Sequence, residues 1–174
     1  GRGYHQAMSY PSSFAGLCSA LLLLGASGDD VQHLTIPGQT VAVTLTLPGF
    51  KAEAPDDPTN TLLFGTLGDG VAVSLLFEEN FPHFSGAERV RRRSKEAKFK
   101  SFPSGAVACC EFTLEVRNTL TMKHYHAYPT TEDYSFDLHV SVSTLGKVPG
   151  AKFERADFLA LVQSLRVQGR VDAS

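Results

Sequence analysis

The residues in this sequence best suited to chemistry are two histidines separated by one position, His124 and His126. Alternate side chains of a β-strand point to the same face, so both imidazoles could reach one metal ion. His139 is the candidate third ligand, and Asp137 shares its face of the next predicted strand. The register of the intervening turn decides whether these side chains meet. Two interpretations stay open: a zinc or copper site, or histidines that lie unrelated on half-exposed strands.

A second group of residues is suited to binding because it is strongly basic. Seven of the 16 Lys and Arg residues fall within twelve positions, and they are Arg89, Arg91, Arg92, Arg93, Lys95, Lys98 and Lys100. Such a segment can attract phosphates, an anionic membrane surface or an acidic protein, or it can be the solvated side of a helix. Stacking aromatic residues lie only at its far end, so we expect no specific nucleic acid. The candidate binding residues are Arg89, Arg91, Arg92, Arg93 and Lys95.

Motifs that mark common enzyme classes are absent from the sequence. It contains no G-x-S-x-G elbow, no phosphate-binding loop and no H-E-x-x-H helix. The adjacent Cys109 and Cys110 lack the C-x-x-C spacing of redox motifs, and on a strand one of them should be buried and the other exposed. The sequence therefore predicts no catalytic residue. A hydrolase assembled from distant loops stays a second alternative.

The composition indicates one ordinary globular domain. The 174 residues are 43% hydrophobic and 20% charged, with a formal net charge of −2, which excludes wholesale disorder and a global basic field. Residues 14–26 are an uncharged apolar run that is too short to span a bilayer. They fit the core of a secretory signal, which would make the protein periplasmic or secreted, or else a buried helix of a cytoplasmic protein. We divide the chain into an apolar export segment (1–28), one domain (29–168) and a tail (169–174).

Alternating hydrophobicity predicts that most of the domain is made of strands. We expect strands at 41–47, 61–67, 71–77, 106–117, 120–128 and 134–143. The glycine-rich residues 68–70 predict a hairpin between the second and third of these. Short turns join the last three strands into an antiparallel meander. The meander would carry the histidine pair on its middle strand and His139 on its last.

Two helices complete the predicted elements. Ser85 and Glu88 have capping-box spacing, which predicts a helix over 86–97 that carries the basic residues. Apolar residues at i, i+3, i+4 and i+7 from Phe158 predict a core-facing helix over 154–167. Strands, a helix, more strands and a final helix indicate the α+β class, with helices packed on an antiparallel sheet.

This order of elements resembles the PsbP-like family of extrinsic photosystem proteins, their Ran-binding relatives and small bacterial secreted or lipid-anchored proteins. The resemblance covers about Val41 to Val167. It rests on Leu47-Pro48-Gly49-Phe50, the 68–70 hairpin, the mid-chain helix, the meander and the ending Ser164-Leu165-Arg166. It implies a three-layer α/β/α sandwich and a non-enzymatic role in binding or assembly, and it transfers no catalytic residue.

On this basis the leading expectation is a non-enzymatic binding or assembly domain that is exported or associated with the cell envelope. Its partner would be a protein or an envelope component, contacted through the rim of the sheet or the basic helix. The alternative is a small-ligand or metal-binding protein that uses His124 and His126, with zinc or copper as the metal.

Overall fold

The structure is a computed structural model that describes residues 30–80, 84–117, 119–146 and 151–168. Of these residues, 52% lie in strands and 13% in two helices, so the fold is mostly β. The expected export segment and the expected tail lie outside the described residues. Within the described ranges, no helix has the length and apolarity that crossing a membrane requires.

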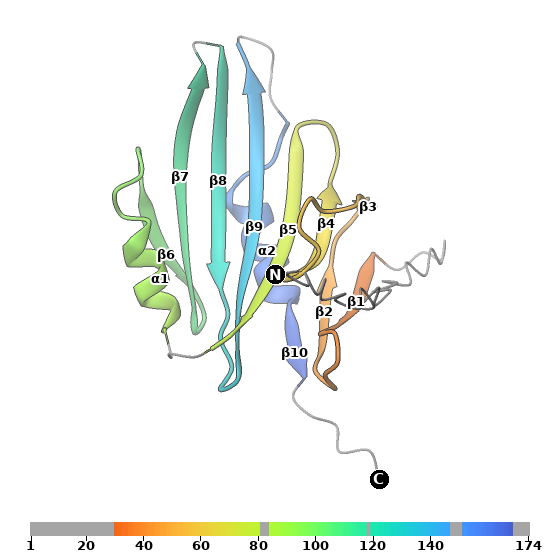
Figure 1. Ribbon diagram of the computed structural model, residues 1–174. Coiled ribbons are helices and arrows are strands. Elements are labelled where there is room, and N and C mark those ends of the chain that lie inside the picture. The colour runs from red at the N-terminus through yellow and green to blue at the C-terminus, as the bar shows by residue number, and fades with distance from the viewer. Residues whose placement is uncertain (1–29, 81–83, 118, 147–150, 169–174) are drawn as a thin grey trace, which may run out of the picture.

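Seven antiparallel strands form the larger sheet, in the order β3-β4-β5-β9-β8-β7-β6 (Figure 1). They are β3 (Lys51–Ala52), β4 (Thr61–Thr66), β5 (Val71–Glu79), β6 (Lys100–Ser104), β7 (Val107–Arg117), β8 (Leu120–Tyr128) and β9 (Tyr134–Leu145). The β4–β5 hairpin turns at Gly68 and Gly70, whose φ angles of 129° and 76° are ones that residues with a Cβ rarely adopt. The predicted hairpin and meander are thus confirmed.

Three further strands form a smaller antiparallel sheet. They are β1 (Val31–Thr35), β2 (Ala42–Thr46) and β10 (Arg166–Gln168), in the order β1-β2-β10. The two helices are α1 (Gly86–Arg92) and α2 (Arg155–Ser164). In Figure 1, α1 lies in front of the larger sheet and α2 lies behind it.

The main core lies between the larger sheet, the smaller sheet and α2. Fully buried side chains from all three parts meet there: Val43 and Leu45 from β2, Tyr125 and Leu138 from the larger sheet, and Phe158 from α2. We call this side of the larger sheet its core face. A small second cluster lies under α1 on the opposite side, where Val90 packs on Cys110 and Tyr128.

The predicted three-layer α/β/α sandwich is wrong. A second β-sheet, rather than helices alone, shares the core face with α2, and α1 has only seven residues. The predicted helix over 86–97 ends at Arg92, and the predicted helix over 154–167 ends at Ser164. The chain then returns as β10, which pairs with β2.

The strands that the sequence did not reveal are short or lie at sheet edges. β3 and β10 have two and three residues, and β6 contains Pro103 in a segment predicted to be a loop. Proline lacks a backbone N–H donor. It is tolerated in an edge strand because the outer side of that strand has no neighbour that needs the donor. Few of these positions are buried, so hydrophobic alternation does not mark them.

Candidate metal centre

The three candidate metal ligands lie together on the sheet face opposite the core. His126 of β8 is the direct cross-strand partner of His139 of β9, and His124 is two residues away along β8. The turn that sets this register is closed by hydrogen bonds from the Thr131 backbone N–H to the Tyr134 carbonyl and from the Tyr134 N–H to Thr131 Oγ1. The sequence could not decide this register. We call this side of the larger sheet the histidine face.

The imidazoles of the histidine face are close enough to share an ion. One ring nitrogen from each of His124, His126 and His139 lies within 4.8 Å of the other two. The His126 and His139 rings stack with their centroids 4.3 Å apart and an interplanar angle of 7°. His126 is buried, and the other two histidines are half-buried.

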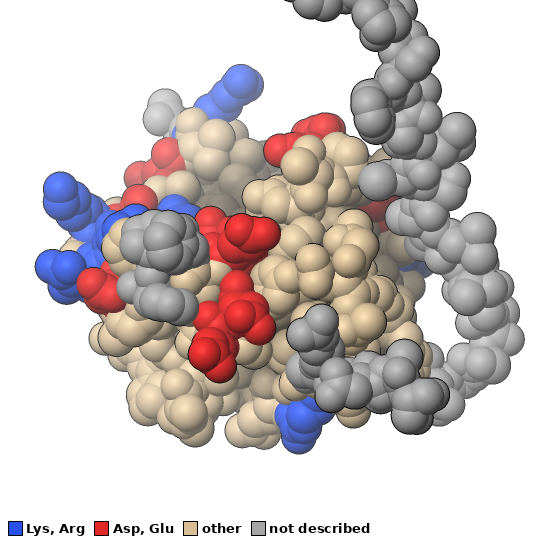
Figure 2. All heavy atoms as spheres, turned by 60° about the horizontal axis from the view of Figure 1, so that its bottom comes forward, with Lys and Arg blue, Asp and Glu red and all other residues tan. Residues whose placement is uncertain are grey.

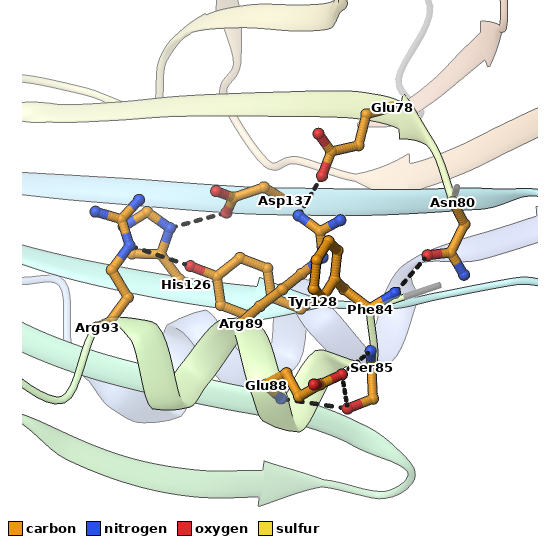
Figure 3. Close-up of polar contacts among 10 residues, drawn as sticks. All are labelled: Glu78, Asn80, Phe84, Ser85, Glu88, Arg89, Arg93, His126, Tyr128 and Asp137. Atoms are coloured by element: carbon orange, nitrogen blue, oxygen red, sulfur yellow. Dashed lines mark hydrogen bonds and ion pairs between the residues drawn. The ribbon is translucent and has the colours of Figure 1, made fainter. Parts of the chain in front are cut away.

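Hydrogen bonds orient all three rings. His124 Nδ1 lies 2.9 Å from His139 Nε2, so one of these two nitrogens carries the shared proton. His126 Nδ1 lies 2.8 Å from Asp137 Oδ1 (Figure 3). Because a carboxylate accepts, this contact places the proton on His126 Nδ1 and leaves the Nε2 lone pair free. His124 Nε2 is buried and has no hydrogen-bond partner in the described part of the chain.

Burial keeps the rings of His124 and His139 uncharged. Desolvation, together with the neighbouring His126, lowers the pKa of His139 to about 3. The same two causes, again with burial the larger, lower the pKa of His124 below its usual value of 6.5. Both rings are therefore neutral at pH 7, and a neutral imidazole is the form that binds a metal ion.

Aromatic side chains and α1 surround the histidines. Phe112 of β7 stacks on His124 and His126, with centroid distances of 5.0 and 5.5 Å. The guanidinium of Arg93, which follows α1, donates from Nε to the Tyr128 hydroxyl at 3.4 Å (Figure 3). These contacts shield the histidine face from water on the side of the sheet that α1 covers.

A capping box places α1 over the sheet. The Glu88 backbone N–H donates to Ser85 Oγ at 3.2 Å, and the Ser85 backbone N–H donates to the Glu88 carboxylate at 3.0 Å (Figure 3). Gly86 then lets the helix approach closely, because a Cβ there would lie 2.7 Å from the Tyr128 carbonyl oxygen. The sequence predicted the capping box, but not the contact of α1 with the histidine face.

The five basic residues singled out from the sequence divide into two groups. Arg89 forms an ion pair with Glu78, and Arg93 bonds Tyr128, so both hold α1 in place. Arg91, Arg92 and Lys95 are exposed. Figure 2 shows Lys and Arg side chains gathered at one side of the molecule, next to a group of Asp and Glu side chains.

The two neighbouring cysteines are both buried and free, so the prediction that one of them is exposed is wrong. Cys109 packs into the main core, and Cys110 lies under α1. Because both faces of β7 are covered at this point, alternation along the strand does not bring either side chain to solvent. Burial raises the pKa of the Cys109 thiol to about 11 and that of Cys110 to about 12, so both stay protonated.

The arrangement can bind an ion after a local change in side-chain torsion. A metal ion lies in the plane of each imidazole that binds it, and the lone pairs of parallel rings do not converge. Ion binding therefore requires rotation of the rings, and this breaks the bond between His124 and His139. Sequence reasoning found all three histidines and Asp137. It missed Phe112, Tyr128 and the contact of Arg93 with Tyr128. Arg93 follows the buried Val90 by three positions, a spacing that places both on the same side of a helix, and this was the available signal.

Comparison with known proteins gives a fold likeness and no family. No family model matches the chain, and no curated protein matches it. A crystal structure of a protein from Bacteroides thetaiotaomicron is similar to this chain with a TM-score of 0.50 and 8% sequence identity. The match covers 76% of this chain and 46% of that one, so the chain spans about half the length of the protein it resembles. At this identity the likeness concerns the fold alone.

Proposed function

We propose that this protein binds a zinc or copper ion through His124, His126 and His139. The observation that carries the proposal is that one nitrogen from each of three imidazoles lies within 4.8 Å of the other two on one sheltered sheet face. Imidazole nitrogen is a preferred ligand of zinc and copper among the divalent metals of the first transition row. Of the interpretations left open by the sequence, the geometry supports this one best.

Three further features support a metal over a purely structural role for the histidines. The rings of His124 and His139 are neutral at pH 7, as ligands must be. His124 Nε2 is buried without a partner in the described residues, and such an atom costs stability unless something binds it. Asp137 behind His126 is the kind of carboxylate that orients histidine ligands in known metal sites. The proposal concerns binding, and it includes no catalytic step.

Metal titration tests the proposal. The full chain, freed of metal with a chelator, is titrated with ZnCl₂ and with CuSO₄ by isothermal calorimetry, and bound metal is measured by elemental analysis. We expect one ion per chain. We also expect the metal to raise the free energy of unfolding, by about 2.7 kcal/mol when free metal is a hundred times Kd.

Matched variants show whether the ion sits on the histidine face. Asp137→Asn keeps the shape of the side chain and should weaken metal binding by about 10- to 100-fold. His126→Gln and His139→Gln should weaken it at least as much. His33→Gln is the control, because His33 is exposed on β1 of the other sheet. Equal metal binding by wild type and by all three site variants would refute the proposal, as would a wild type that binds no metal.

The exposed residues around α1 support a second function, the binding of an acidic protein. Five exposed side chains, which we call the basic surface, remain after Arg89 and Arg93 are assigned to the fold: Arg91, Arg92, Lys95, Lys98 and Lys100. Exposed Glu79, and Glu78 in its ion pair with Arg89, lie at the end of strand β5. A flat anionic membrane would be repelled by such carboxylates, whereas a protein can match both signs.

Charge reversal tests this second function. Binding of a fluorescent poly-glutamate peptide is measured by anisotropy at several salt concentrations, with anionic lipid vesicles as the competing surface. Arg91→Glu with Arg92→Glu should abolish peptide binding, and Arg117→Glu, a reversal at an exposed site on β7, should not. Preferential binding to vesicles, or an unchanged affinity of the double variant, would contradict the idea.

A further inference from the structure

We infer that a cavity on the core face of the larger sheet binds a small amphiphilic carboxylate of the medium-chain fatty acid type, with its alkyl chain inside and its carboxylate on Arg166. The cavity lies between the larger sheet, the end of α2 and β10. It is separate from the proposed metal centre, because its floor residues Ala127 and Leu138 belong to the main core and the histidines project from the opposite face.

The cavity is open on one side, and its volume is about 250 Å³. An engineered apolar cavity of about 150 Å³ accommodates benzene, so this one has room for about ten non-hydrogen atoms. That is the size of an eight-carbon carboxylate.

The walls are mostly apolar, with Thr130 and Thr131 as their uncharged polar residues, and they come from elements far apart in the sequence. Ala127 and Leu138 from the larger sheet face Val162 and Leu165 from the end of α2, with Val167 of β10 beside them. The room exists because Ala127 is small: the preceding core-face residue of β8 is Tyr125, whose ring packs against Phe158. A wall of this kind favours an alkyl chain over a polar ligand.

One charged side chain lines the cavity, and it is positive. Arg166 is exposed, so it lies on the open side of the cavity. Its Nη1 donates to the carbonyl oxygens of Gln163 and Leu165 at 2.5 and 2.9 Å, and these bonds hold the guanidinium at the end of α2. Its Nε and Nη2 have no protein acceptor among the described residues, and two such donors match the two oxygens of a carboxylate. No Asp or Glu is among the residues that line the cavity.

Three ligands with the same eight-carbon chain and different head groups test the assignment of both parts of the ligand. Octanoate, 1-octanol and octylamine are titrated into the full chain by isothermal calorimetry, and ¹H–¹³C NMR follows the methyl groups of Val162 and Leu165. We expect octanoate to bind, 1-octanol to bind more weakly and octylamine not to bind. Arg166→Gln should weaken octanoate about tenfold, the effect of losing a charged hydrogen-bond partner, and leave 1-octanol unchanged. Arg117→Gln is the matched control on an exposed strand position.

Substitutions that fill the cavity with a larger side chain give a second test. Ala127→Leu should abolish binding of octanoate and 1-octanol, and unfolding in urea shows whether the variant is folded. Leu165→Phe closes the cavity from the half-exposed side of α2 and replaces Ala127→Leu if that variant does not fold. Equal affinities for octanoate and 1-octanol, wild-type octanoate binding by Arg166→Gln or by the filled variant, or no binding at millimolar octanoate would each overturn the inference.

Discussion

At the scale of single residues, the histidine face makes stability depend on pH. The folded protein holds His139 neutral, with its pKa lowered to about 3 by burial and by the neighbouring His126, whereas the ordinary value is 6.5. Between these two values the unfolded chain binds a proton at His139 and the folded protein does not. The contribution of this ring is therefore fully present above pH 6.5 and declines as the pH falls below it.

Urea unfolding of the chelator-treated protein between about pH 7.5 and about pH 5.5 measures this effect. We expect the free energy of unfolding to fall by up to about 1.4 kcal/mol per pH unit below pH 6.5 on account of His139. His139→Gln should have a smaller slope, and His33→Gln, at an exposed position, should keep the wild-type slope. Parallel slopes for wild type and His139→Gln would contradict the assignment.

The two buried thiols should be inert in the folded protein. Cys109 and Cys110 are buried, and burial raises their pKa values to about 11 and about 12, so neither forms the reactive thiolate near pH 8. In a Cys18→Ser background, Ellman's reagent should therefore modify no thiol in native protein and both thiols in urea. Rapid modification without urea would mean that β7 is open to solvent on one face.

At the scale of the elements, an ion pair fastens α2 to the sheet. Arg155, the first residue of α2, donates from Nε and Nη2 to the two carboxylate oxygens of Glu111 on β7, at 2.9 and 2.8 Å. Glu111 is 5% exposed, and Lys123 lies 3.7 Å from the same carboxylate. Removal of the arginine would thus leave a buried carboxylate with one weaker partner.

We expect Arg155→Ala to lower the free energy of unfolding by about 2 kcal/mol at pH 7, measured in urea. The hydrogen bonds from Arg155, ahead of the opposing effect of burial, lower the pKa of Glu111 below its ordinary 4.5. The stabilisation is therefore present above about pH 4.5 and is lost as the pH falls through the lowered pKa. Arg117→Ala, at an exposed position, should change stability by less than about 0.5 kcal/mol. A loss for Arg155→Ala no larger than that of this control would show that the pair contributes nothing.

The seating of α1 gives another prediction at this scale. Alanine favours a helix over glycine by about 1 kcal/mol, so Gly86→Ala would stabilise an isolated helix. In the protein its Cβ would lie 2.7 Å from the Tyr128 carbonyl oxygen and 3.3 Å from the Ala108 Cβ. Since backbone cannot move aside as a flexible side chain can, we expect a net loss of about 1–3 kcal/mol in urea unfolding.

A change at an exposed position outside the helix serves as the control for Gly86→Ala. Ser94→Ala lies at an exposed position in the turn after α1 and should leave stability within about 0.5 kcal/mol of wild type. If Gly86→Ala instead proved as stable as wild type or more so, α1 would not lie against β8 as described.

At the scale of the whole molecule, the protection of backbone amides against hydrogen exchange should decrease from the centre of the larger sheet to its edges. β9 pairs along its length with β5 on one side and β8 on the other, and all three contribute fully buried side chains. β3 has two exposed residues and one partner. In hydrogen–deuterium exchange followed by mass spectrometry, we expect β5, β8 and β9 to exchange last and β3 to exchange first. Uniform exchange across the sheet would contradict this order of stability.

The difference between long central strands and short edge strands also explains which parts of the fold could be predicted. β5, β7, β8 and β9 have 9, 11, 9 and 12 residues, and apolar residues recur at alternate positions over much of their sequences, so the sequence pattern reveals them. β10 has three residues and one half-buried side chain, and only its pairing with β2 makes it a strand. The smaller sheet, and with it the architecture, therefore could not be predicted from local sequence patterns.

The candidate site could be predicted to the extent that it depends on strand periodicity. The alternation of side chains along a strand is enough to place His124 and His126 on one face. The place of His139 beside His126 depends on the register across the 129–133 turn, and the contact of Arg93 with Tyr128 depends on how α1 packs. Packing and register are set by the whole chain, so no local spacing encodes them.

The pairing of β2 with β10 has a consequence for synthesis on the ribosome. The Thr46 N–H on β2 bonds Ser164 Oγ, 118 positions later in the chain. At about 5–20 residues per second, the ribosome needs roughly 6–24 s to add that length. During that interval Val43 and Leu45, which are fully buried in the finished fold, have neither α2 nor β10 to cover them. We therefore expect the nascent chain to expose the apolar side chains of β2 until α2 and β10 have been synthesised.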